Sequence, residues 1–150
     1  MVWGCIGWNG VGMLVEVQGI LDVNQFCSIL EEGLVESFEK LKMNEDDRIF
    51  QQVNNLKHTS KKGQRWLLDN NIRLLDWPPQ SPDINPLEHL WGHLKQHLKY
   101  DTPPKGVHEL WERLVKEWNA ISPDVCQKLI ESMPGRIQAV LKAKGGHTKY

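Results

Sequence analysis

An Asn-Gly pair near the start of the chain most constrains how it can fold. Asn9-Gly10 separates two β-prone runs, residues 2–8 and 11–17. Both turn residues tolerate a positive φ, which the tight turns of β-hairpins require. The pattern therefore predicts two antiparallel strands at the start, onto which the rest of the fold is built.

The residues after this hairpin alternate between helical and extended patterns. Apolar side chains recur at helical spacing over 23–41, and Asp22 has the position of an N-cap. Short β-prone segments at 48–53 and 72–77 enclose a helix predicted from Thr59 or Ser60 to Asp69. A hairpin followed by alternating helices and strands predicts an α/β fold with a mixed sheet.

Helices dominate the second half of the chain. Asn85 is a good N-cap and Pro86 suits the first helical position, so a helix is predicted to begin there. A second helix is predicted over about 106–120, and a last one from Ser122 to a Gly145-Gly146 stop. The side chains expected to face inward on the first two are Leu87, Leu90, Trp91, Leu94 and Leu98, then Val107, Leu110, Trp111, Leu114, Val115 and Trp118.

Composition excludes several classes of protein. A chain of 150 residues with 40% hydrophobic and 25% charged residues fits one globular domain. It has no apolar run near the ~20 residues of a membrane helix and no basic start typical of a signal peptide, so neither membrane insertion nor secretion is expected. Three scattered cysteines indicate a reducing compartment.

The net charge of −1 conceals an uneven distribution. Residues 1–47 hold nine acids and two bases, whereas residues 48–150 hold sixteen bases and ten acids. An anionic partner would therefore meet the second part of the chain. Unequal solvated faces are the competing interpretation.

Two segments carry a family resemblance. Residues 50–60 read FQQVNNLKHTS, and residues 76–91 read DWPPQSPDINPLEHLW. Together with the opening MVWGC, the hairpin and the basic 142–149 stretch, they closely resemble the catalytic domain of Tc/mariner DDE transposases. The resemblance runs across essentially the whole chain, 1–150, which is predicted to be a partial domain of this kind.

The resemblance implies an RNase H-like fold and a protein that acts on DNA in the nucleus. If it is not nuclear, a cytoplasmic location is expected. In the family two aspartates and a glutamate hold two Mg²⁺ ions, which activate the attacking oxygen and stabilise the leaving oxygen of a phosphodiester. Dimers of related transposases suggest a homodimer. No small-molecule cofactor is implied.

The carboxylate set of the family is incomplete here. Glu88 matches the family's glutamate, and the second aspartate, 34 residues before it, falls on Val53. The first aspartate belongs to a central strand, and we expect this chain to lack both that strand and the family's N-terminal helix-turn-helix region. We therefore expect that Mg²⁺ is not bound productively and that the chain is inactive. Without the central strand, either the hairpin closes onto 48–53 or the sheet stays split.

Further residues are open to two interpretations each. A basic cluster after Val53 predicts either phosphate contacts or a solvated helix start; it consists of Lys57, His58, Lys61, Lys62 and Arg65. His89, His93 and His97 lie on one helix face and could share a transition metal, although a solvated polar face is favoured. Asp83 is expected to stiffen its loop, and Trp66, Trp91, Trp111 and Trp118 to pack in the core rather than stack on bases.

Two alternative functions stay open from sequence alone. The first is that Met1 is not the true start and that missing upstream sequence completes a longer, active transposase. Val53 counts against this alternative. The second is a non-catalytic protein-interaction module built from the C-terminal helices.

Overall fold

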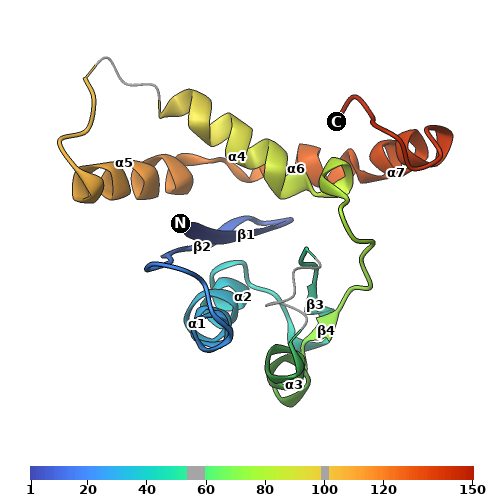
Figure 1. Ribbon diagram of the computed structural model, residues 1–150, viewed down its shortest axis with the longest axis horizontal. Helices are drawn as coiled ribbons and strands as arrows, with labels where there is room; N and C mark the ends of the chain where they lie inside the picture. Colours follow the sequence, from blue (N-terminus) through green and yellow to red (C-terminus); the bar gives the residue numbers. More distant parts are fainter. Residues whose placement is uncertain (54–59, 99–101) are drawn as a thin grey trace. The chain divides into compact units, whose positions relative to one another are not determined.

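The computed structural model describes residues 1–53, 60–98 and 102–150, which form two compact units (Figure 1). The first unit comprises residues 1–5 and 12–81, and the second comprises residues 6–11 and 82–150. No helix in these three ranges is long and apolar enough to cross a membrane.

The predicted hairpin is present and contributes residues to both units. Strand β1 (Val2–Gly7) pairs with β2 (Gly10–Glu16), and Trp8 and Asn9 connect them. The turn therefore lies one residue earlier than predicted. Gly10 already belongs to β2 and has a φ of +125°, a backbone conformation that residues with a Cβ rarely adopt.

The helical pattern over 23–41 folds as one run with a wider turn in its middle. It consists of α1 (Val23–Ile29), the π-helical segment η1 (Leu30–Val35) and α2 (Glu36–Lys40). The predicted cap is confirmed, because Asp22 Oδ1 accepts a hydrogen bond of 2.8 Å from the Gln25 amide. After a short 3₁₀ turn, η2 (Glu45–Asp47), the chain enters the next strand.

Two short strands complete the first unit. β3 (Ile49–Phe50) and β4 (Arg73–Leu74) are parallel, and α3 (Lys61–Asp69) connects them. Within the described residues, β1–β2 and β3–β4 are two separate two-stranded sheets, so the hairpin does not close onto the 48–53 segment. The core of this unit includes Phe26, Leu30, Leu34, Phe38, Phe50, Leu67 and Ile72.

Helices build the second unit after a 3₁₀ turn, η3 (Pro82–Ile84). They are α4 (Pro86–His97), α5 (Val107–Ala120), α6 (Pro123–Glu131) and α7 (Met133–Lys142). The single last helix predicted from Ser122 is thus two helices that meet at Ser132. Pro134 explains the break, because a proline inside a helix has no amide to donate and clashes with the preceding turn.

Tryptophan packing holds α4 against α5. Trp118 is fully buried, and its ring stacks on Trp91 with 5.1 Å between centroids. Leu90 and Leu94 are buried beside them, as their positions predict. The prediction was wrong at the start of α5, where Val107 is 73% exposed and Leu110 is 42% exposed. The apolar stripe of α5 is covered only toward its end.

Candidate functional site

Glu88 lies in the first turn of α4, and local sequence explains its position. Pro86 fills the first helical position, and Asn85 caps the helix by accepting a 3.2 Å hydrogen bond at Oδ1 from the Leu87 amide. The Asn85 side-chain amide also lies 3.5 Å from Glu88 Oε1 and donates to it. The positive end of the helix dipole further favours a carboxylate here.

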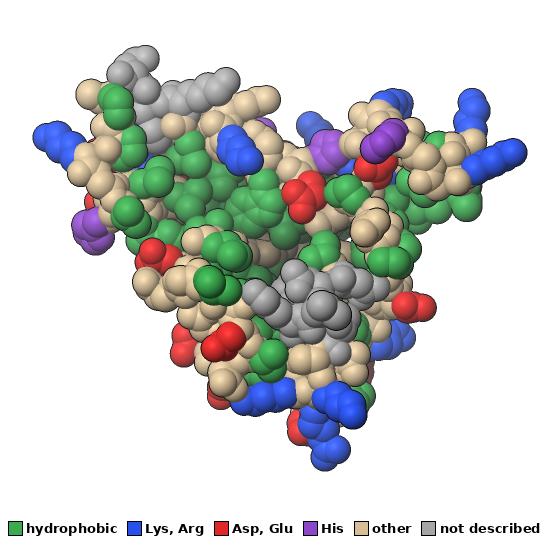
Figure 2. Space-filling model, in the orientation of Figure 1, with side chains coloured by type: hydrophobic (Ala, Val, Ile, Leu, Met, Phe, Trp, Pro, Cys, Tyr) green, Lys and Arg blue, Asp and Glu red, His purple; other side chains and the backbone are tan. Residues whose placement is uncertain are grey.

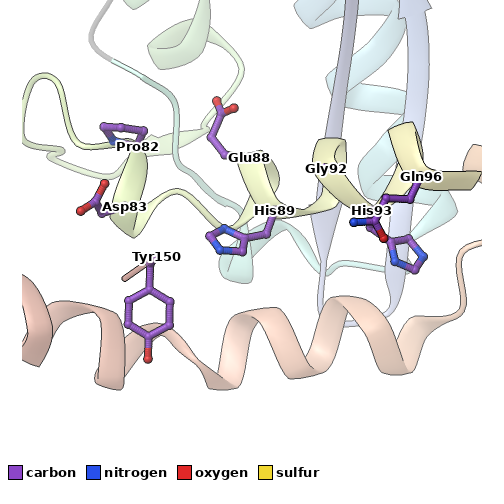
Figure 3. Close-up of a pocket in the computed structure, with 8 residues that line it drawn as sticks. All are labelled: Pro82, Asp83, Glu88, His89, Gly92, His93, Gln96 and Tyr150. Atoms are coloured by element: carbon purple, nitrogen blue, oxygen red, sulfur yellow. The ribbon is translucent and has the colours of Figure 1, made fainter. Parts of the chain in front are cut away.

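A shallow pocket of about 540 Å³ runs along α4 (Figure 3). Figure 3 shows Glu88 and His89 pointing to opposite sides of the helix, with Tyr150 on the side of His89. Glu88 therefore faces away from the histidine that follows it. The pocket is lined by Pro82, Asp83, Glu88, His89, Gly92, His93, Gln96 and Tyr150.

Asp83 anchors the loop before α4, in agreement with its predicted role. Its Oδ2 accepts hydrogen bonds from the Thr148 hydroxyl at 2.7 Å and from the Thr148 amide at 3.1 Å. These bonds lower the pKa of Asp83 below its ordinary value, and the bond from the hydroxyl has the largest effect. The carboxylate is thus occupied by the 147–150 segment.

Arg136 is the residue of this site that sequence reasoning missed. It is only 2% exposed, although no acidic residue follows Glu131 in the sequence. Its Nη1 donates to the carbonyl of Asp83 at 3.0 Å and to His89 Nδ1 at 3.1 Å. Its Nε donates to Ser132 Oγ at 2.7 Å, and its guanidinium packs 4.8 Å from the Tyr150 ring centroid.

The three histidines of α4 contact other protein groups or one another. Nδ1 of His89 accepts from Arg136, and burial together with that positive charge lowers the pKa of His89. The rings of His93 and His97 lie 4.2 Å apart, and His97 Nδ1 is 2.9 Å from the His93 carbonyl. In the described ranges, no three His, Cys, Asp or Glu side chains gather so that they could hold a metal ion.

The basic cluster is described only in part. Lys61, Lys62 and Arg65 are exposed on α3, and Figure 2 shows Lys and Arg side chains gathered at the lower tip that α3 occupies. Lys62 Nζ donates to Asn24 Oδ1 at 2.6 Å, and Arg65 Nε lies 3.0 Å from Asp69 Oδ1. Lys57 and His58 lie outside the described residues.

Comparison with known families decides the assignment. Residues 22–118, well over half of the chain, match the family described as DDE superfamily endonuclease. The chain belongs to the DDE superfamily of endonucleases. This confirms the resemblance read from residues 50–60 and 76–91.

The relatives of this DDE chain are transposases of the Tc/mariner type. The transposable element Tc1 transposase of Caenorhabditis elegans is 40% identical over 152 residues, and the Tcb2 transposase of Caenorhabditis briggsae is 37% identical over 150. Each alignment covers 100% of this chain and 54% of the relative. The chain therefore spans about half the length of the curated relatives it matches.

Solved structures show the same fold. The Mos1 transposase catalytic domain, solved with raltegravir and Mn, matches with a TM-score of 0.85 at 17% identity over 99% of this chain and 76% of that one. The Mos1 mariner paired-end complex with Mn matches with a TM-score of 0.84 at 16% identity, over 99% and 44%. These matches confirm the predicted RNase H-like α/β class.

The position to which the resemblance assigns the family's second metal-binding aspartate holds a valine. Val53 follows β3 in the first unit, is 41% exposed and ends in two methyl groups, which offer Mg²⁺ no oxygen. Asp83, in the loop before Glu88, is already bonded to Thr148. Since Mg²⁺ needs clustered oxygen ligands, these residues fit the family's metal ions poorly.

Proposed function

We propose that this chain is a DDE transposase domain that binds DNA and does not cleave or join it. The observation that carries the proposal is the hydrocarbon side chain of Val53, which stands where the Tc/mariner resemblance assigns a metal-binding aspartate. Glu88 alone supplies one carboxylate, and two-metal phosphoryl chemistry needs several.

DNA as the partner is supported by charge and by the relatives. Sixteen of the eighteen Lys and Arg residues lie after residue 47, and Lys61 is exposed on α3. Two of the similar structures are a Mos1 transposase paired-end complex with left transposon end and a pre-cleavage Mos1 transpososome. We further propose a nuclear location. A second copy of the chain is proposed as a partner, and light scattering tests this dimer.

A nuclease assay tests the inactivity. The purified chain is incubated with Mg²⁺ or Mn²⁺ and with nicked or transposon-end DNA, and the products are resolved on a denaturing gel. We expect no metal-dependent cleavage or strand joining. Cleavage that Glu88→Ala abolishes and that the matched control Glu131→Ala leaves intact would overturn the proposal.

Salt-dependent binding tests the DNA contact separately. Each phosphate contact contributes about 0.9 to the slope of log K against log salt, so Lys61→Gln is expected to lower that slope by about one. Lys42→Gln, an exposed lysine in the acidic first part of the chain, serves as control and should not change it. An absence of binding at low salt, measured by fluorescence anisotropy, would favour the protein-interaction alternative.

A further inference from the structure

A buried cation connects the loop before Glu88 with a segment far along the chain. Arg136 on α7 donates to the carbonyl of Asp83, 53 residues earlier, and to His89 on α4. Thr148 donates twice to the Asp83 carboxylate from 65 residues away. The backbone carbonyl and the carboxylate of Asp83, the middle residue of η3, are therefore held by α7 and the 147–150 segment.

We propose that Arg136 and Thr148 are positioning residues that fix the η3 turn and, through it, the start of α4 and Glu88. The proposal concerns how Glu88 is held, and it stands whether or not the chain binds DNA. Within the part of the chain that the structure describes, neither residue has a hydrogen bond to Glu88; both act through the Pro82–Ile84 turn, and Arg136 also through His89 on α4.

The hydrogen bonds of the loop give a continuous route from these contacts to Glu88. The Asn85 amide donates to the Pro82 carbonyl at 2.9 Å, which ties the cap residue to the turn. The Asn85 side chain then caps α4 through the Leu87 amide and contacts Glu88 Oε1. A shift of the turn would therefore displace the cap and, with it, the first turn of the helix.

Because Arg136 is buried, it depends on its hydrogen-bond partners. A guanidinium that is 2% exposed must have its donors satisfied inside the protein, because an unpaired buried charge is strongly destabilising. Nε bonds Ser132, Nη1 bonds Asp83 and His89, and the Tyr150 ring covers one face. Figure 3 shows this ring on the His89 side of α4. Arginine alone among the cationic side chains offers donors in a fixed fork for such a set.

Thr148 allows a test that separates hydrogen bonding from packing. Thr148→Val keeps the shape of the side chain and removes the hydroxyl donor, whereas Thr148→Ser keeps the donor. Amide hydrogen exchange of the full chain is followed by NMR at residues 85–90, with α5 as the internal reference. For Thr148→Val we expect about fivefold faster exchange at Asn85 and Glu88, the effect of losing one hydrogen bond, and no change in α5. Thr148→Ser should restore the wild-type rates to within about twofold.

Arg136→Lys gives a second test of the same idea. One ammonium group cannot reach Ser132, Asp83 and His89 together, so the same amides should exchange faster. Arg65→Lys in α3, where the arginine pairs with Asp69 of its own helix, is the control, because it leaves the reference helix α5 unchanged. Unchanged exchange at 85–90 in Thr148→Val, an equal increase across α5, or a failure of Thr148→Ser to rescue would each overturn the proposal. The Thr148 pair decides the question even if Arg136→Lys does not fold.

Discussion

Replacing Gly33 with alanine tests how tightly the first helix packs on the hairpin. The added Cβ would lie 2.9 Å from Trp3 Cζ3 and 2.9 Å from Val15 Cγ2, which is closer than real Cβ contacts. Both side chains pack against the core of the first unit, so they cannot simply swing away. Overpacking of this kind costs about 1–3 kcal/mol. Alanine gains only about 1 kcal/mol in helix propensity, which leaves a net loss of up to about 2 kcal/mol.

Gly92 provides the matched control in the middle of α4. A Cβ added there meets no atom within 4 Å, so only the propensity gain remains. Gly92→Ala should therefore stabilise the second unit by about 1 kcal/mol. Replacing glycine with alanine is thus expected to lower stability at Gly33 and to raise it at Gly92. The difference comes entirely from the atoms that surround each position.

Urea unfolding measures both effects. Tryptophan fluorescence and circular dichroism report the midpoint and the slope m, and an unchanged m shows that the midpoint shift reflects stability. If Gly33→Ala raises the midpoint, or if both variants shift it in the same direction, the packing argument is wrong. A double variant, Gly33→Ala with Val15→Ala, should recover part of the loss because it removes one of the two clashing side chains.

Two further predictions concern the second unit. Trp118→Ala should cost about 3–5 kcal/mol in urea unfolding, since the ring is fully buried on Trp91, whereas Trp8→Ala at a 51% exposed position should cost far less. Thr148 lowers the pKa of Asp83, so the stability from that carboxylate is complete above its ordinary pKa of 3.8 and is lost as pH falls through the lower folded value. Asp83→Asn should therefore flatten the decline of Tm below about pH 4 in calorimetry; an unchanged acid limb would contradict this.

Signals contained within a few residues were predicted well. The Asp22 cap, the Asn85-Pro86 helix start and the hairpin depend on contacts between near neighbours, which sequence shows directly. Pro134 was an equally local signal for the break between α6 and α7 and could have been used. For the site, Glu88 was placed correctly at the start of a helix, by its motif and its cap together.

Features that depend on distant partners could not be predicted. The residues next to Arg136 in sequence do not show its distant contacts, the Asp83 carbonyl, the His89 ring and the Tyr150 ring. Val107 and Leu110 continue an apolar helical stripe, yet which part of a stripe is covered depends on where α4 lies against it. Periodicity gives the direction of a helix face and carries no information on its partner.

The hairpin also has a consequence for how the chain is made. Its tip, residues 6–11, belongs to the unit that is otherwise formed by 82–150, and the Trp8 carbonyl accepts from Gln127 Nε2 at 3.3 Å, 119 residues away. During synthesis the tip therefore leaves the ribosome before residues 82–150 and waits for partners that emerge later. The first unit can assemble from 1–5 and 12–81 in the meantime, whereas the second cannot be completed from a fragment that starts at Pro82.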